Sequence, residues 1–343
     1  MTSLQSWITK AVPATAQERA AALWAFAYFF TLLAGYYVLR PLRDQMGIAG
    51  GVKALPWMFT ATFVTLLVAQ PLYGALVSRV TRARFIPVVY HFFVANLVLF
   101  WILLTAGVAT VIVARVFFVW VSVFNLFAVA VFWSFMADLF TSEQGKRLFG
   151  FIGAGGTAGA LVGPAVTIGL SVPLGPTNLL IAAIIFLELA VLCVHQLERS
   201  GNVRQPSRPN EQRIGGSAFA AASELIYSPY LLGVAVWVSL LSFGATILYF
   251  QQAHIVAATV HDAGAQTRIF ASIDLAVGLL TLATQVFATG WLLKRFGTGM
   301  AAGALPAVYV VGFVALALAS AGTDREVTPL SQLSARLNGS STG

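Results

Sequence analysis

Charged residues are scarce in this chain: they make up 9% of its 343 residues, whereas hydrophobic residues make up 59%. So few polar side chains cannot cover the surface of a water-soluble domain of this length. The chain also has a single cysteine, Cys193, which excludes an internal disulfide framework and a cysteine-based metal site. The composition therefore predicts an integral membrane protein that is embedded in the lipid bilayer and has lipid as a partner.

The residue patterns of an enzyme are missing as well. The sequence has no nucleophile spaced with a base, no paired catalytic carboxylates and no metal-ligand spacing. Gly155-Gly156-Thr157 lacks the lysine of a phosphate-binding loop and lies in an apolar stretch. The net charge of +8 could indicate nucleic-acid binding, but the basic residues lie in short turns between apolar stretches. We expect no enzymatic activity, no cofactor or metal, and no nucleic-acid partner.

Long apolar runs dominate what is present. A helix needs about 20 apolar residues to cross a bilayer. The sequence contains nine such runs, near residues 20–39, 55–77, 85–107, 109–137, 148–170, 178–197, 231–251, 269–291 and 300–320. Because lipid cannot hydrogen-bond backbone amides, each run must satisfy its own backbone groups as a helix. The predicted fold is an all-α polytopic membrane bundle without strands.

Basic residues are distributed unevenly among the connections between these runs. The amino terminus and the loops on its side of the bilayer carry 13 Lys and Arg residues, and the opposite side carries six. Loops rich in Lys and Arg stay in the cytoplasm. We therefore expect a cytoplasmic amino terminus, in a bacterial inner membrane.

A polar stretch divides the apolar runs into two groups. It contains Pro206, Pro209 and four arginines, and it is predicted to be a flexible cytoplasmic linker. The expected organisation is an amino-terminal six-helix bundle at 1–197, the linker at 198–229, a partial carboxyl-terminal bundle at 230–321 and a polar, disordered tail at 322–343. If each half had six helices, the second would lack three. Its small-residue faces at Gly303 and Gly312 would then be open to lipid, and oligomerisation could cover them.

A cluster of charges, Arg40-Pro41-Leu42-Arg43-Asp44, follows the first apolar run. Arginine presents a rigid fork that matches phosphate geometry. Pro41 is expected to break the helix and to turn both guanidinium groups towards a central cavity. This pattern predicts an anion-binding site. In the alternative interpretation, both arginines extend to lipid headgroups and Asp44 pairs with one of them.

Three further ionisable residues interrupt apolar runs: Arg115, Glu188 and Asp274. An ionisable side chain at mid-membrane should face the bundle interior and have a partner, so we expect Arg115 to pair with Glu188. Arg115 is predicted to be a substrate contact or a structural lock. Glu188, and Asp274 closer to the headgroups, are predicted to take up protons in coupling or to form structural ion pairs.

Two glycine patterns point to helix packing and to turns. Small residues four apart, including Gly159 and Gly163 before Pro164, predict close helix packing and a bend. A second pattern begins at Gly74 and again at Gly290: a leucine follows two residues on, and basic residues precede the next run. This repetition is typical of duplicated transporter bundles. The predicted gating turns contain the basic residues Arg79, Arg82, Lys294 and Arg295.

These patterns resemble motifs of the major facilitator superfamily. The turns at Gly74 and Gly290 resemble its signature between helices two and three and between helices eight and nine. The stretch from Gly159 to Pro164 resembles its fifth-helix motif, and Arg115 resembles its fourth-helix arginine. The first turn departs from the signature, because Ser78 stands where an aspartate is usual.

A narrower resemblance is to the ATP/ADP translocases of plastids and intracellular bacteria. It rests on Leu39-Arg40-Pro-Leu-Arg43-Asp44 and on the segments Phe132-Trp133-Ser-Phe-Met-Ala-Asp138 and Gly145-Lys146-Arg147-Leu-Phe-Gly150. By this resemblance, Arg40 and Arg43 would meet substrate phosphates. Where that family has an acidic residue in helix four, this chain has Ser122 and Asn125.

The expected function is secondary transport by alternating access, in which two bundles rock about a central site. The substrate is expected to be an organic anion or a nucleotide, exchanged across the membrane. Its predicted contacts are Arg40, Arg43, Asp44 and Arg115. There are two alternatives: a proton-coupled transporter of another solute, with Glu188 as the titrating group, and a truncated membrane scaffold that transports nothing.

Overall fold

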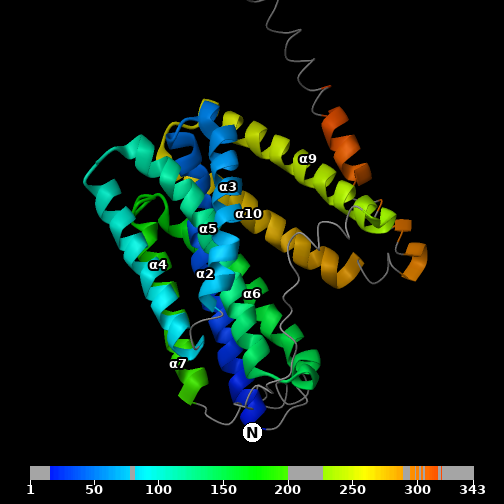
Figure 1. Cartoon of the computed structure of the whole chain (residues 1–343). Helices are drawn as coiled ribbons and strands as arrows, with labels where there is room; N and C mark the ends of the chain where they lie inside the picture. Colours follow the sequence, from blue (N-terminus) through cyan, green and yellow to red (C-terminus); the bar gives the residue numbers. More distant parts are fainter. Residues whose placement is uncertain are drawn as a thin grey trace, which may run out of the picture. The chain divides into compact units, whose positions relative to one another are not determined.

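The computed structural model describes residues 16–77, 82–199 and 227–288, and beyond them residues 294–297, 299–300, 303, 306–315 and 318. All regular elements in this part of the chain are helices (Figure 1), so the prediction of an all-α fold is confirmed. The long helices are α2 Ala16–Ala49, α3 Leu55–Val77, α4 Arg82–Thr105, α5 Thr110–Leu139, α6 Ser142–Leu170, α7 Leu179–Arg199, α9 Pro229–Thr259 and α10 Ala263–Ala283. Among the described residues, eight helices are long and apolar enough to cross a membrane.

Two compact units divide the described residues. The first contains the residues up to Arg199 together with Tyr249–Leu282, so the last part of α9 and nearly all of α10 belong to it. The second contains residues 227–248 and the described residues from 283 onward. The boundaries of these units differ from those of the predicted bundles at 1–197 and 230–321, because Tyr249–Leu282 belongs to the first unit.

Helix α2 lies at the centre of the first unit and packs mainly on α6 and α7, and then on α5 (Figure 1). It is buried on several sides: Leu32, Leu39 and Leu42 are inaccessible to solvent. The predicted break at Pro41 is wrong, because α2 continues through Pro41 to Ala49. Proline removes one backbone donor, but helices that are enclosed by neighbouring helices tolerate that loss.

A line of glycines on α6 explains how closely α6 approaches α2. A Cβ atom added at Gly155, Gly159 or Gly163 would lie 2.4 to 2.7 Å from atoms of α2, including backbone oxygens. Such distances leave no room for any side chain. The three glycines are four residues apart, which places them on one helix face. Helix α6 then continues through Pro164 to Leu170.

Aromatic side chains and hydroxyl groups fill the interior between α2, α4 and α5. The rings of Phe29 and Phe132 stack with their centroids 4.1 Å apart. The hydroxyls of Tyr28 and Tyr90 are hydrogen-bonded to each other in the buried core, and the Tyr90 hydroxyl also donates to the Ala128 carbonyl. A tyrosine in an apolar core needs a partner for its hydroxyl, and these contacts supply one.

The start of α6 is tied to the start of α2. Thr141 and Gln144 form a reciprocal capping box, which satisfies two backbone donors of the first turn of α6. The Gln144 amide also donates to Glu18 Oε1 at 2.8 Å, and Arg147 Nη2 lies 3.6 Å from the same oxygen. Polar residues in the first turn of α6 therefore fix the amino-terminal ends of both helices.

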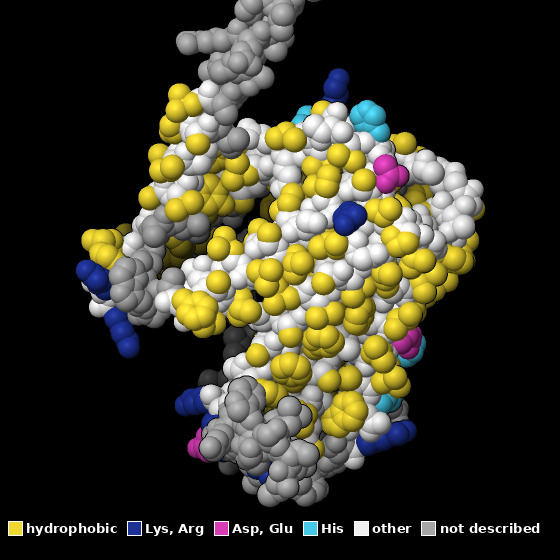
Figure 2. All heavy atoms as spheres, turned by 180° about the vertical axis from the view of Figure 1, so that it is seen from behind, with side chains coloured by type: hydrophobic (Ala, Val, Ile, Leu, Met, Phe, Trp, Pro, Cys, Tyr) yellow, Lys and Arg dark blue, Asp and Glu magenta, His cyan; other side chains and the backbone are white. Residues whose placement is uncertain are grey.

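The outward surface of the described residues suits a lipid environment. Hydrophobic side chains are spread over the described part of the face in Figure 2, and Lys and Arg side chains on it are few and scattered. On α3, large side chains such as Trp57, Phe63 and Leu67 are more than half exposed. Surfaces of this kind are compatible with a bilayer and not with water.

In the second unit, the first part of α9 packs on the short helix Pro306–Ala315. A Cβ atom at Gly244 would lie 3.0 Å from the Tyr309 ring. Between the two helices is an apolar pocket of about 400 Å³, lined among others by Trp237, Ile247 and Phe313. A π-helical segment, Thr284–Ala288, follows α10.

Candidate functional site

Two arginines on the last turns of α2 form the centre of the candidate site. Arg40 and Arg43 are three residues apart and therefore lie on one helix face. Arg43 donates to Asp44 Oδ1 from Nε at 3.0 Å and from Nη2 at 2.7 Å. The two side chains are only 16% and 7% exposed. The cation of Arg43 is thus matched by the carboxylate of the next residue inside the protein.

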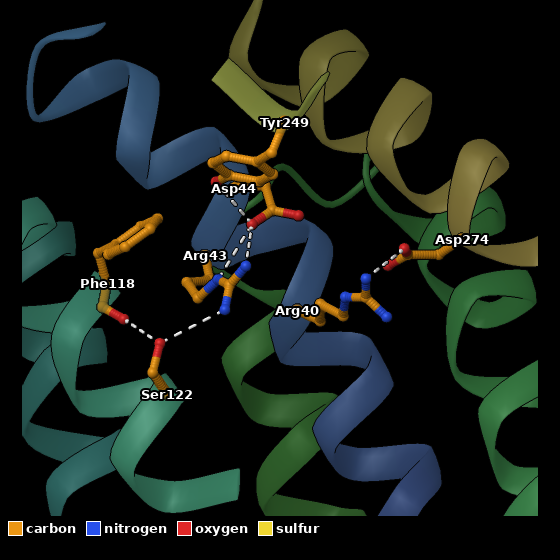
Figure 3. Close-up of polar contacts among 7 residues, drawn as sticks. All are labelled: Arg40, Arg43, Asp44, Phe118, Ser122, Tyr249 and Asp274. Atoms are coloured by element: carbon orange, nitrogen blue, oxygen red, sulfur yellow. Dashed lines mark hydrogen bonds and ion pairs between the residues drawn. The ribbon is translucent and has the colours of Figure 1, made fainter. Parts of the chain in front are cut away.

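Residues of α5 and α9 complete the surroundings of this pair (Figure 3). The Tyr249 hydroxyl donates to Asp44 Oδ1 at 3.0 Å, and Arg43 Nη1 donates to Ser122 Oγ at 3.4 Å. The guanidinium carbon of Arg43 lies 5.0 Å from the Phe118 ring centroid and 6.0 Å from that of Tyr249. Aromatic faces attract a cation at these distances, so Arg43 is held by rings as well as by charge.

The second arginine reaches α10. Arg40 Nη2 lies 3.5 Å from Asp274 Oδ1, and the two side chains are 38% and 9% exposed (Figure 3). Asp274 Oδ2 is buried and has no hydrogen-bond partner among the described residues. Asp274 is enclosed next to Arg40, and its expected depth close to the headgroups stays a prediction. This ion pair therefore leaves one side of Arg40 open and one carboxylate oxygen unsatisfied.

The charges of this cluster sum to zero. Two guanidinium groups, Arg40 and Arg43, face two carboxylates, Asp44 and Asp274. Taking charges out of water is costly, and each pair repays part of that cost only while both partners are present. An anion that entered the cluster would therefore have to compete with a carboxylate for an arginine, or to enter together with a cation.

Aromatic and small residues pack α9 and α10 of the first unit against earlier helices. Phe59 of α3 contacts the rings of Tyr249 and Phe250, with centroids 5.3 and 5.2 Å apart. A Cβ atom at Gly264, at the start of α10, would lie 2.8 Å from the Ser171 carbonyl oxygen after α6. The end of α9 and the start of α10 are thus packed against helices that lie more than 90 residues earlier in the chain.

Arg115 lies apart from this cluster. Its Nε donates to the Gly50 carbonyl at 2.7 Å, and the residue is exposed. It is five residues from the start of α5, about 7 Å along the axis, and not at mid-membrane. Instead of facing the bundle interior, Arg115 satisfies a carbonyl just beyond the end of α2.

The expected ion pair between Arg115 and Glu188 is also wrong. Glu188 Oε2 lies 3.8 Å from His91 Nε2, and the two side chains are 43% and 55% exposed. They project from α7 and α4, which pack side by side (Figure 1). An apolar helix has no polar side that would tell which way a single charge faces, and this is why sequence reasoning gave Glu188 the wrong neighbour.

Other predicted residues are only partly described. Gly74 lies within α3 and Arg82 begins α4, but their side chains are outside the described residues, as are Arg79 and Gly290 altogether. Lys294 and Arg295 are exposed, and the Arg295 guanidinium lies 5.9 Å from the Phe296 ring. The glycines Gly159 and Gly163 contact α2, as described above, and Pro164 lies within α6.

Sequence reasoning missed Tyr249, Phe118 and His91. Tyr249 lies two residues before the pair Gln251 and Gln252 at the end of an apolar run, and that local polarity could have indicated a buried contact. Nothing in the sequence around Phe118 distinguishes it from the other aromatic residues of α5. In the described part of the chain, no group of three or more His, Cys, Asp or Glu side chains could hold a metal.

A bundle of apolar membrane helices that encloses paired charges is typical of secondary membrane transporters. Comparison with protein families agrees: the family model described as Major Facilitator Superfamily matches residues 20–330. The chain belongs to this family. It is therefore an integral membrane protein and a transporter, and members of this family are not enzymes. No curated protein and no solved structure matches the chain.

Proposed function

We propose that this transporter carries an organic anion, which binds by taking the place of a carboxylate on Arg40 or Arg43. The supporting observation is the cluster in which two arginines on one face of α2 are each neutralised by an aspartate. An anionic substrate offers the arginines the same chemistry as Asp44 and Asp274 do. Substrate and internal carboxylates would then compete for the same donors.

The geometry of the two pairs gives the order of this competition. Arg40 makes a single contact of 3.5 Å with Asp274 and is 38% exposed, whereas Arg43 makes two shorter contacts with Asp44. Arg40 is therefore the first contact of the entering anion. Arg43 follows only when α9 moves, because Tyr249 of α9 also holds Asp44.

A nucleotide is the organic anion that the resemblance to ATP/ADP translocases favours. Tyr37 lies under Arg40, with the guanidinium carbon 5.6 Å from its ring centroid, and Phe118 and Tyr249 lie beside Arg43. These rings could stack on a base while the arginines hold phosphates. In an exchange, the nucleotide that leaves would carry back the charge that the entering nucleotide brings across the membrane.

Reconstitution into liposomes tests the anion site. We expect Arg40→Ala and Arg43→Ala each to reduce uptake of labelled ATP into ADP-loaded liposomes at least tenfold, and Arg43→Lys to restore little, because lysine lacks the planar fork. Arg268→Ala, which removes an exposed arginine of α10, is the matched control and should retain uptake. If both cluster variants transport as the wild type does, the anion site is refuted.

A second candidate, proton-coupled transport, is favoured by the unsatisfied oxygen of Asp274. A proton on this carboxylate would remove its charge, which is costly at a buried oxygen without a hydrogen-bond donor among the described residues, and would free Arg40 for an anion. Coupling would then depend on Asp274 and not on Glu188. A pH gradient without internal nucleotide should drive uptake of an organic anion, Asp274→Asn should abolish that dependence, and Glu188→Gln should retain it. Uptake that needs internal ADP and ignores the gradient supports exchange instead.

The orientation in the membrane belongs to the same proposal. The amino terminus and the turn between α3 and α4 are proposed to be cytoplasmic, in a bacterial inner membrane, because the basic residues gather on that side. Labelling of a cysteine introduced at Ser78 in right-side-out vesicles tests this orientation. In a variant whose native Cys193 is replaced by serine, labelling by an impermeant thiol reagent from outside would contradict it.

A further inference from the structure

An ion pair on the outer surface of the first unit has no role in the anion cluster. It joins His91 of α4 to Glu188 of α7, both of which lie near the middle of their helices. His91 is nine residues after Arg82, the first residue of α4, and Glu188 is eleven residues before Arg199, the last residue of α7. Each side chain is therefore about 15 Å along the axis from that end of its helix. That distance is half the thickness of a hydrocarbon core of about 30 Å.

This position is unfavourable in a bilayer. The two side chains are 55% and 43% exposed and lie 3.8 Å apart, so their mutual contact covers only part of each. The other ring nitrogen of His91 contacts the Pro87 carbonyl at 2.7 Å. A charged group at the bilayer centre costs roughly 2.5 to 3.5 kcal/mol, and ionisable residues there generally face protein or a water-filled cavity.

The surroundings of the pair are apolar and regularly spaced. On α4, the exposed residues on the side of His91 recur at intervals of three and four. On α7 the same intervals recur around Glu188. The members of these two rows are Val88, His91, Ala95, Val98 and Ile102 on α4, and Ile181, Ile185, Glu188, Leu192 and His195 on α7. Rows of this spacing are the seams along which helices pack, and one polar position within such a seam selects register and partner.

We propose that this face binds a second copy of the chain, and that His91 and Glu188 pair across the interface. Copies inserted in one orientation are related by a two-fold axis along the membrane normal. Because His91 and Glu188 of one copy already lie at one depth, His91 of each copy meets Glu188 of the other at that depth. Four side chains then form a ring in which each carboxylate lies between two imidazoles.

The second copy is favoured over an unrelated partner by charge. The pair is its own complement, since it presents one basic and one acidic group at the same depth. An unrelated membrane protein would need a matching pair at the same depth and spacing. His195, the other titratable side chain of this face, is held by its contact with the Val191 carbonyl at 2.9 Å and lies two turns from Glu188.

Cysteine crosslinking in liposomes tests the interface. In full-length protein carrying Cys193→Ser, we expect Ile185→Cys to give disulfide-linked dimers at a high lipid-to-protein ratio. Leu67→Cys places a thiol on an equally apolar and exposed part of α3 and is the matched control, which should remain monomeric. If Ile185→Cys crosslinks no more than Leu67→Cys in liposomes, the proposal is overturned. It is also overturned if the same variant, in native membranes, crosslinks only to another protein.

A charge exchange shows whether the pair acts between copies. The single variants H91E and E188H should each dimerise about three- to tenfold more weakly, measured by energy transfer between labelled copies in liposomes. A mixture of the two should recover, because two carboxylates of one copy then face two imidazoles of the other. The double variant H91E/E188H keeps both groups and should dimerise as the wild type does, which controls for folding. A mixture no stronger than the single variants would overturn the proposed pairing.

Discussion

Two pairs of ionisable side chains in the first unit are held in opposite ways. Asp44 accepts three hydrogen bonds at one oxygen and is 7% exposed, enclosed by α2, α5 and α9. Glu188 lies 3.8 Å from His91 on the outer side of α4 and α7 and is 43% exposed. Both pairs belong to membrane-spanning helices. Their difference shows that burial by neighbouring helices, more than position along a helix, decides what an intramembrane charge does.

The largest loss of stability is expected when Asp44 is replaced. Asp44→Ala leaves the Arg43 guanidinium buried without its carboxylate, and we expect a loss of about 3 to 5 kcal/mol in the free energy of unfolding. Thermal unfolding in detergent measures it. Replacing both partners, Arg43→Met with Asp44→Leu, should recover most of the stability but none of the uptake. An Asp44→Ala protein as stable as the wild type would mean that the pair is not enclosed in the membrane.

A smaller effect is expected at Tyr249. Tyr249→Phe removes the hydroxyl that donates to Asp44 and leaves the ring beside Arg43 and Phe59. Interhelical hydrogen bonds in membranes contribute about 0.6 to 1.7 kcal/mol, and the loss should lie in this range. A double-mutant cycle with Asp44→Asn isolates the contact. Strict additivity of the two changes would show that the hydroxyl and the carboxylate are not coupled.

Arg115 should matter less than either residue of the cluster. Arg115→Ala removes the hydrogen bond to the carbonyl of the buried Gly50, and we expect a loss of about 1 kcal/mol, the net contribution of a typical hydrogen bond. Liposome uptake should stay above half of the wild-type rate. A loss of uptake as large as that of Arg43→Ala would place Arg115 in the substrate path after all.

The smallest change is expected when Glu188 is altered in an isolated monomer. Glu188→Gln in dilute detergent should shift the free energy of unfolding by less than about 1 kcal/mol, because polar contacts between membrane helices contribute only about 0.6 kcal/mol on average. The same variant should clearly weaken dimers in liposomes. Comparable losses of monomer stability for Glu188→Gln and Asp44→Ala would contradict the inference that the Arg43–Asp44 pair is enclosed and the His91–Glu188 pair is not.

The sequence was sufficient to predict the helices but not all of their ends. Lipid forces long apolar runs into helices, and the structure contains helices in the first eight of them. The end of the first helix was placed near Leu39 because the apolar residues stop there. Helix α2 in fact continues for ten residues to Ala49, since the charges at Arg40, Arg43 and Asp44 are satisfied by protein and the helix need not end at the membrane surface.

The site could be predicted only where its residues are close in sequence. Arg40 and Arg43 share a helix face, so their proximity follows from helix geometry. Asp274 and Tyr249 come from helices more than 200 residues further on, and no pattern in one sequence indicates which side chain of α2 they meet. Glu188 was recognised as unusual by its depth, but the direction in which it faces depends on how α4 and α7 pack.

The glycine line of α6 has a mechanical consequence. Along this line of glycines the backbones of α6 and α2 are in contact without intervening side chains. We therefore expect the two helices to move together as one rigid unit. Arg40 and Arg43 belong to α2 and are part of this rigid unit. Separation of Arg40 from Asp274 therefore requires movement of α10, whose Gly278 packs against the Leu161 side chain of α6.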